Sequence, residues 1–286
     1  MTRGSRPGGE ESRVGRILVA LDASPASLAA LQVAARLAAA LKGELYGIYV
    51  EEETLLRGAE LPITSAVGSF SGAIRQVERP ELERHLRTQA AKAKLALESI
   101  AVQAQLPWSF RVARGAVAEE LLRAADDADL ISLGCCGWSL IESHRIGTTT
   151  QTILARADAP VLLLRRRLRM GQSVVTVYDG SEAARAALRL ATSIAHDPVT
   201  PLVIVFPTTG KPADGLRLSV QSEFEVLGVN RSVRYRTVVH RDPALLEAVT
   251  QGEDTGILIL PTGDIFDKGF NELLTHLECP LLVVRR

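Results

Sequence analysis

The sequence of this chain repeats itself, and the duplication limits the folds that the chain can adopt. Residues 159–166 read APVLLLRR and residues 279–286 read CPLLVVRR, so two distant segments each consist of proline, an apolar run and a pair of arginines. A second pair of matching segments follows apolar runs, as Asp22-Ala23-Ser24 and as Asp179-Gly180-Ser181. Two similar structural units in tandem are therefore predicted.

Short apolar runs alternate with helical patterns, and nearly continuous apolar runs are typical of parallel strands covered on both faces. In the first half, strands are expected over 16–21, 45–50, 110–113, 130–133 and 161–164, and helices over 25–41, 81–105, 117–126 and 148–157. The pattern restarts with a strand over 173–178 and a helix over 182–195. The predicted fold class is α/β, with two tandem doubly wound domains, each built on a five-stranded parallel sheet.

The domain boundaries follow from the same repeat. Residues 1–13 are expected to be a disordered tail, because they contain glycine and arginine but no apolar segment of the kind found in secretory signals. Residues 14–168 and 169–286 are expected to be the two domains. The arginine-rich run at 165–169 lies at their boundary, and it could attract an acidic partner or simply end a strand and open a linker.

The charge and cysteine content exclude several classes of protein. Lysine plus arginine and aspartate plus glutamate each number 33, whereas a general nucleic-acid-binding protein would be basic. Three cysteines form neither a disulfide framework nor a C-x2-C metal motif, which suits a reducing compartment. The longest uncharged stretch, Leu61 to Ile74, is interrupted by Gly, Ser and Pro, so no membrane span is expected. A soluble, cytoplasmic protein is predicted.

Residues 51–80 show little periodicity and have a Gly/Ser-rich centre. A connection of this length inside a compact domain is unusual. It is interpreted either as a surface excursion or as a lid over a ligand.

The stretch 134–150, GCCGWSLIESHRIGTTT, follows an expected strand and leads into an expected helix. Gly134 and Gly137 would let backbone approach a ligand closely, and Gly147 precedes hydroxyl side chains at a helix N-terminus, where amides and the helix dipole favour an anion. The hypothesis is a phosphate-binding loop. In the second half this connection is shorter, since Pro280 lies 19 positions after Pro261, whereas Pro160 lies 26 positions after Gly134.

The shorter second connection begins PTGDIFDKGF and contains acidic residues at Asp264 and Asp267, where a phosphate would require amides and hydroxyls. One ligand site per chain is therefore predicted, in the first half. The sequence contains no P-loop, no G-x-S-x-G elbow and no metal-binding cluster, so catalysis has little support.

The spacing Gly134-x2-Gly137-x9-Gly147-Thr148, together with Asp22 after the first strand, fits the nucleotide-binding signature of one family. Over about residues 14–286 the chain resembles a tandem universal stress protein, with the adenine nucleotide alpha hydrolase-like fold. The resemblance implies adenine near the Val50 backbone and Asp22 beside the nucleotide. It places Gly134 and Gly137 at ribose and phosphate, and Gly147, Thr148 and Thr149 at the phosphates.

The ligand that the resemblance implies is ATP, or ADP or AMP in its place, with Mg²⁺ or Mn²⁺ easing repulsion between Asp22 and phosphate. Asp22 could instead be only a turn residue. Cys135 and Cys136 could form a redox switch or fill apolar space, and Trp138 could shield or block the site.

The predicted function is an ATP-binding stress-response regulator whose second domain acts as a pseudo-dimer partner. The last strands, 161–164 and 281–284, are expected to pair within the chain, and a further homodimer is an open alternative. Other functional alternatives are a nucleotide-free interaction scaffold and a slow ATPase.

Overall fold

The computed structural model describes residues 15–58, 65–67, 74–76, 79–135, 147–164, 172–208, 213–239, 254–262, 277 and 279–285. The tail at 1–13 and the arginine run at 165–169 lie outside these residues. The first half contains β1 (Arg16–Ala20), α1 (Pro25–Leu41), β2 (Glu44–Glu52), α2 (Glu53–Gly58), β3 (Ser65–Val67), β4 (Ile74–Gln76), α3 (Arg79–Gln103), β5 (Trp108–Gly115), α4 (Val117–Ala125), β6 (Leu130–Gly134), α5 (Thr148–Arg156) and β7 (Val161–Leu164).

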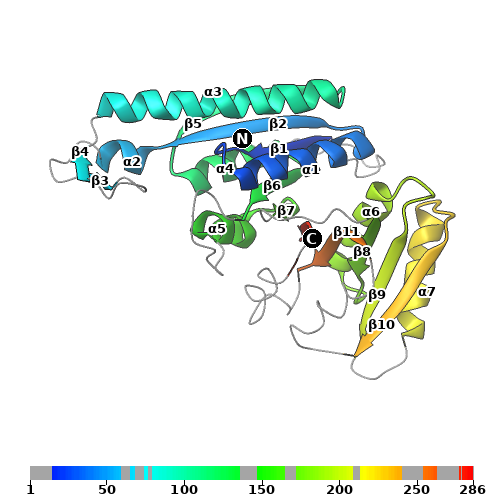
Figure 1. Cartoon of the computed structure of the whole chain (residues 1–286). Coiled ribbons are helices and arrows are strands. Elements are labelled where there is room, and N and C mark those ends of the chain that lie inside the picture. Colours follow the sequence, from blue (N-terminus) through cyan, green and yellow to red (C-terminus); the bar gives the residue numbers. More distant parts are fainter. Residues whose placement is uncertain are drawn as a thin grey trace, which may run out of the picture.

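The described elements of the second half follow the order of the first. They are β8 (Ser173–Val177), α6 (Glu182–Ile194), β9 (Leu202–Thr208), α7 (Asp214–Val226), β10 (Val233–Val239), β11 (Thr255–Pro261) and β12 (Leu281–Val284). Figure 1 shows the two halves as successive bodies of helices and strands, joined where β7 meets the end of the chain.

Ten of the described strands form one sheet in the order β10-β9-β8-β11-β12-β7-β6-β1-β2-β5. Within each half the neighbouring strands are parallel, and each half has the order third, second, first, fourth, fifth strand. This confirms the predicted α/β class with doubly wound parallel strands. The two five-stranded sheets join edge to edge, because β12 pairs with β7 antiparallel and Leu282 lies opposite Leu162.

Helices cover both faces of the sheet in the first half. One buried apolar cluster contains residues of α1 and α3, and the cluster on the opposite face contains residues of α4 and α5. Figure 1 shows α3 above the sheet and α4 and α5 below it. This arrangement follows from the winding, since the connections on the two sides of β1 run in opposite directions along the sheet.

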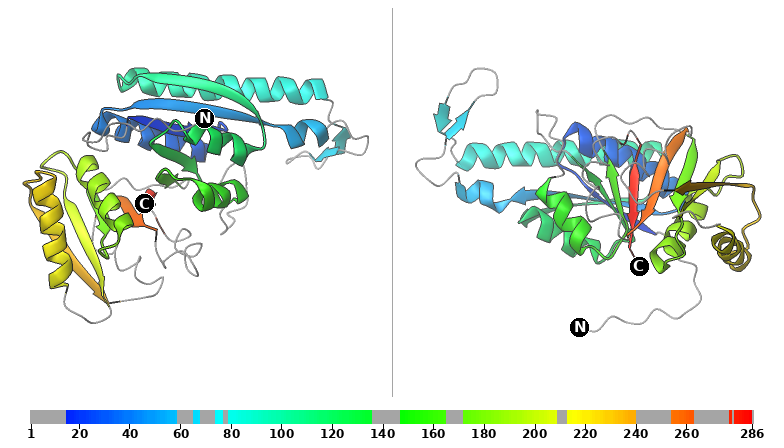
Figure 2. Two further views of the ribbon diagram at one scale, coloured as in Figure 1. Left: turned by 180° about the vertical axis from the view of Figure 1, so that it is seen from behind. Right: turned by 90° about the horizontal axis from the view of Figure 1, so that it is seen from below.

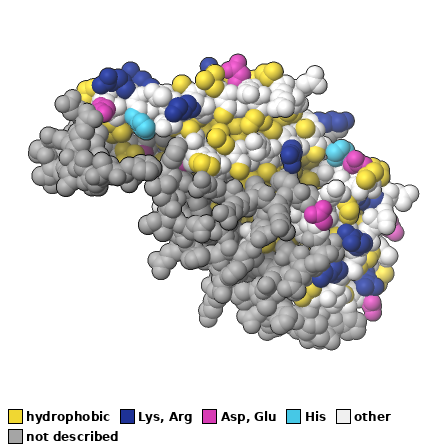
Figure 3. All heavy atoms as spheres, in the orientation of Figure 1, with side chains coloured by type: hydrophobic (Ala, Val, Ile, Leu, Met, Phe, Trp, Pro, Cys, Tyr) yellow, Lys and Arg dark blue, Asp and Glu magenta, His cyan; other side chains and the backbone are white. Residues whose placement is uncertain are grey.

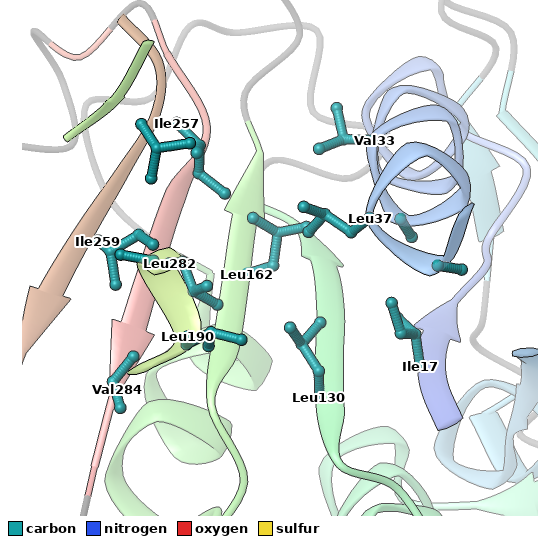
Figure 4. Packing of buried hydrophobic residues seen from close by; sticks show 14 of the residues in the cluster. Ile17, Val33, Leu37, Leu130, Leu162, Leu190, Ile257, Ile259, Leu282 and Val284 are labelled. Carbon is teal, nitrogen blue, oxygen red and sulfur yellow. The ribbon is translucent and has the colours of Figure 1, made fainter. Parts of the chain in front are cut away.

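The apolar core continues across the junction between the halves. Leu162 of β7 and Leu282 of β12 are fully buried in the same cluster as α1 and α6. Figure 4 shows Leu162 with Leu130 of the first half on one side and Leu282 and Leu190 of the second half on the other. The halves therefore share a core as well as a sheet.

Local signals in the sequence explain where α1 begins and ends. The Ser24 side chain accepts a hydrogen bond from the Ser27 amide at 3.2 Å, and Pro25 occupies the first turn. Lys42 ends the helix in the left-handed conformation, with φ 54°. α6 begins in the same way, since Ser181 accepts from the Ala184 amide at 3.1 Å.

The stretch 51–80 contains more regular structure than the sequence predicts. β2 continues to Glu52, α2 follows it directly, and β3 and β4 form an antiparallel pair. Figure 2 shows this pair beyond one end of α3. Three-residue strands and a six-residue helix are too short to give a periodic signal, so pattern analysis missed them.

None of the described helices is both long and apolar enough to cross a membrane. The longest, α3, has 25 residues, and it mixes Arg87, Lys94 and Glu98 with the exposed Leu95 and Val102. Figure 3 shows basic, acidic and hydrophobic side chains along the upper edge of the molecule, where α3 lies.

Candidate functional site

The strand order reverses at β1 and β6, and the region beyond the carboxyl ends of these two strands is called the crevice below. These strands are neighbours, and the chain leaves β1 toward β2 but leaves β6 toward β7 on the other side. Such a switch point is where open α/β sheets bind ligands. Asp22 follows β1 and Gly134 ends β6, so two of the predicted site residues flank the crevice.

Val50 lies near the same edge of the sheet, in the part of β2 that extends beyond the end of β1. The β1–β2 register ends at Ala20 opposite Ile48, whereas Val50 pairs on its other side with Ala113 of β5. The backbone of Val50 therefore lies two residues beyond the last paired residue of β1. Gly137 lies outside the described residues, as do Cys136 and Trp138.

Asp22 is half-buried and shapes the turn between β1 and α1. Its Oδ1 accepts a hydrogen bond from the Ser24 amide at 2.9 Å, and its own amide donates to Ser27 Oγ at 3.4 Å. Asp179 makes the same bond to the Ser181 amide, also at 2.9 Å. Both aspartates thus have a turn role, and a ligand role for Asp22 stays a prediction.

Gly134 is required by a close contact within the protein. A Cβ at this position would lie 2.8 Å from the Ala26 carbonyl carbon and 2.9 Å from both Ala26 Cβ and the Ser27 nitrogen. The sequence predicts that this glycine makes room for a ligand. In the structure the same space is occupied by the first turn of α1, which packs directly on the end of β6.

Gly147 has a different environment. It is the N-cap of α5 with φ −60° and ψ 150°, a conformation open to any residue, and the nearest described atom to an added Cβ is the Cys135 carbonyl oxygen at 4.0 Å. Because glycine has no side chain, the N-cap residue itself cannot cap the helix. The first-turn amides have no partner within a helix, so the start of α5 presents donors beside the end of β6.

The three threonines that open α5 differ in exposure. Thr148 is exposed, Thr149 is half-buried, and Thr150 is 4 % exposed. Two hydroxyl side chains are therefore accessible at a helix terminus that favours negative charge. Cys135 is buried in an apolar cluster beside this terminus, which fits the interpretation that it fills apolar space.

The sequence pattern did not identify three further polar residues near the crevice, which are Tyr49, Glu51 and Arg114. Burial, followed by the Glu51 and Asp22 carboxylates, raises the pKa of the Tyr49 hydroxyl. Glu51 is 8 % exposed, and its Oε2 accepts from Arg114 Nε at 3.0 Å and Nη2 at 2.7 Å. The Glu51 carboxylate in turn raises the pKa of the Arg114 guanidinium.

The matching registers of the two halves show what the second half lacks. Ile17 pairs with Leu45 in the first half, and Val174 pairs with Leu202 in the second. Val50 lies five positions after Leu45, and the residue five positions after Leu202 is Pro207. The counterpart of Val50 in the second half is therefore a proline, which has no amide hydrogen.

The polar pair beside the site is also missing from the second half. The same register gives Thr208 and Val239, which lie opposite each other, as the counterparts of Glu51 and Arg114. The second half therefore has uncharged residues at the two positions of this ion pair.

The described residues offer a limited set of metal ligands. They contain no group of three or more His, Cys, Asp or Glu side chains that could hold a metal ion. Mg²⁺ often takes only one or two carboxylates from the protein and the rest of its ligands from phosphate and water. The single Asp22 carboxylate fits that shared mode of binding.

The fold and the geometry of the site define an open α/β protein with a helix N-terminus at its switch point. The model of the universal stress protein family matches residues 13–165, more than half of the chain, and the chain therefore belongs to this family. Among curated proteins, no sequence matches.

Solved structures resemble this chain over nearly its whole length, and two of them illustrate the likeness. A universal stress protein from Archaeoglobus fulgidus DSM 4304 aligns with a TM-score of 0.69 and 16% identity, over 96% of this chain and 97% of that one. A functionally unknown protein from Pseudomonas aeruginosa PAO1 aligns with a TM-score of 0.54 and 14% identity, over 96% and 94% of the two chains. Because both sequence identities are below 25%, these alignments show only that the chain shares the fold of the two structures.

Proposed function

We propose that this protein is an ATP-binding regulator of the stress response that holds one adenine nucleotide in its first half. The observation that carries the proposal is the start of α5, whose N-cap Gly147 is exposed and lies beside the end of β6 at the switch point. Backbone amides at such a terminus bind phosphate without any particular side chain.

The residues around the crevice suggest one direction for the nucleotide. Gly147, Thr148 and Thr149 would hold the phosphates, Gly134 and Gly137 would border the ribose and phosphate, and the Val50 backbone would contact adenine. Asp22 would lie beside the nucleotide and share a Mg²⁺ or Mn²⁺ ion with the phosphates. ADP or AMP would make the same kinds of contact but fewer of them, because each has fewer phosphates than ATP.

The second half is proposed to act as a built-in dimer partner without a nucleotide of its own. Its last strand pairs with that of the first half, and Pro207 and Val239 replace residues that surround the site in the first half. The pairing also covers two sheet edges that would otherwise remain open.

Binding of fluorescent ATP to the wild type, Gly147→Asp and Gly147→Asn tests the proposal. Aspartate and asparagine are both good N-cap residues, so both variants keep α5 folded, but only aspartate repels phosphate. We expect Gly147→Asp to bind at least about tenfold more weakly than Gly147→Asn, the change that about 1.4 kcal/mol produces. Equal binding by the wild type and Gly147→Asp, or no binding by the wild type, would contradict the proposal.

The packing role of Gly134 favours a second candidate, a nucleotide-free interaction scaffold, because this glycine is explained without a ligand. Mass spectrometry of small molecules released from the denatured protein separates the two functions. A co-purified adenine nucleotide would contradict the scaffold. Phosphate release over hours, compared with buffer alone, tests the further alternative of a slow ATPase.

A further inference from the structure

α5 is a short helix that depends on its neighbours for its position. It has nine residues, fewer than an isolated helix needs in water, and only Thr150 and Ile153 are buried within it. Its first turn forms the proposed phosphate site. Whatever holds the other end of α5 therefore influences where that site lies.

The other end of α5 is held from both halves, since Arg156 in its last turn pairs with Glu119 of α4 and a residue of the second half binds its last carbonyls. Arg285 follows β12, and its Nη1 donates a hydrogen bond to the Ala155 carbonyl at 2.8 Å and approaches the Ala157 carbonyl at 3.4 Å. These carbonyls belong to the last turn of α5 and to its C-cap Ala157. A guanidinium group there satisfies carbonyls that lack helical partners and interacts favourably with the helix dipole.

The antiparallel junction explains how Arg285 reaches this point. Val283 lies opposite Val161, so the carboxyl end of β12 lies beside the amino end of β7, which directly follows α5. A cavity of about 490 Å³ lies at the same edge, lined by Arg156 and Asp158 of the first half and by Arg189 and Val284 of the second. Arg285 also lines this cavity, and its hydrogen bonds to α5 link the two halves directly.

We propose that Arg285 is a positioning residue for the nucleotide site, acting through α5 from the second half of the chain. This inference rests on the proposed function. A helix of nine residues is about 13.5 Å long at 1.5 Å per residue, and it moves as one rod. A shift at its C-terminus therefore displaces the first-turn amides at its N-terminus. The second half would thus tune a site to which it contributes no ligand.

The test compares Arg285→Ala and Arg285→Lys with the wild type, and uses Arg185→Ala as the control. Arg185 is also a partly exposed arginine of the second half, but it pairs with Glu223 within that half at 3.7 Å. Hydrogen exchange of the amides at 148–157 reports on α5, ATP titration reports on the site, and thermal unfolding shows whether the variants remain folded.

We expect Arg285→Ala to exchange faster in α5 and to bind ATP roughly 2- to 30-fold more weakly, the range seen for residues that couple distant sites. Arg285→Lys, which keeps a cation and donors, should recover part of both effects, and Arg185→Ala should show neither. Faster exchange with unchanged ATP affinity would overturn the proposal, as would unchanged exchange. If the wild type binds no ATP, the proposed function fails, while the exchange measurement still shows whether Arg285 anchors α5.

Discussion

The turn after β1 has a left-handed residue at its centre, and the two halves fill this position differently. Ala23 has φ 58°, and its counterpart Gly180 has φ 86°. An L-residue in this region costs about 1–2 kcal/mol, whereas glycine adopts it freely. The first half therefore carries strain in the turn beside the candidate site, and the second half does not.

Exchanging the two residues should have opposite effects on stability. We expect Ala23→Gly to raise the free energy of unfolding by about 0.5–1 kcal/mol, since relief of strain exceeds the extra entropy of glycine in the unfolded chain. Gly180→Ala should lower it by about 1–2 kcal/mol, because the added Cβ would also lie 3.2 Å from Leu216 Cδ2. Urea unfolding of the three proteins measures both changes, and a loss of stability in Ala23→Gly would contradict the argument.

At the scale of elements, the packing of α1 on the end of β6 depends on one missing side chain. Gly134→Ala would place a Cβ within 2.9 Å of Ala26 and Ser27 backbone atoms. Backbone on both sides of the contact cannot move aside cheaply, so we expect a loss of about 1–3 kcal/mol, the usual cost of overpacking. Thermal or urea unfolding measures it.

The same substitution elsewhere supplies the control. Gly215 lies in the first turn of α7, is exposed, and has no described atom within 4 Å of an added Cβ. Gly215→Ala should leave the protein as stable or slightly more stable, because alanine favours helix. If Gly134→Ala is as mild as Gly215→Ala, then α1 and β6 do not approach as closely as described.

The elements that the sequence predicts well are those with local end signals. Helices α1 and α5 begin at Pro25 and Thr148 as expected, because a capping serine and a glycine mark their first turns. β5 covers Trp108–Gly115 and is longer than the predicted strand at 110–113. The predicted strand is too short because β5 is an edge strand, and its exposed and half-exposed side chains, such as that of Arg111, interrupt the apolar pattern.

In the candidate site, too, some features follow from the sequence and others do not. The positions of Asp22 and Gly134 at the ends of neighbouring strands follow from the order of strands, which the sequence implies. The Glu51–Arg114 pair does not, because it depends on the register of two strands separated by 63 positions. The contact of Gly134 with α1 likewise arises from packing that no spacing of glycines reveals.

At the scale of the whole molecule, the sheet and the core are continuous through β7 and β12. Leu162 and Leu282 face each other across the antiparallel pair and are fully buried. We therefore expect the wild type to unfold in one cooperative calorimetric transition, although it contains two similar halves. Cooperativity of this kind requires that neither half keeps its full stability when the other unfolds.

Truncating a junction leucine should weaken that coupling. Leu282→Ala should cost about 2–5 kcal/mol as a buried cavity, and because the cavity lies between the halves, the single transition should broaden or split into two. Leu202→Ala removes the same atoms from a site that is 1 % exposed within the second half, so it should lower one transition without splitting it. If Leu202→Ala splits the transition as readily as Leu282→Ala, the junction has no special role, and the second half is not a structural partner of the first.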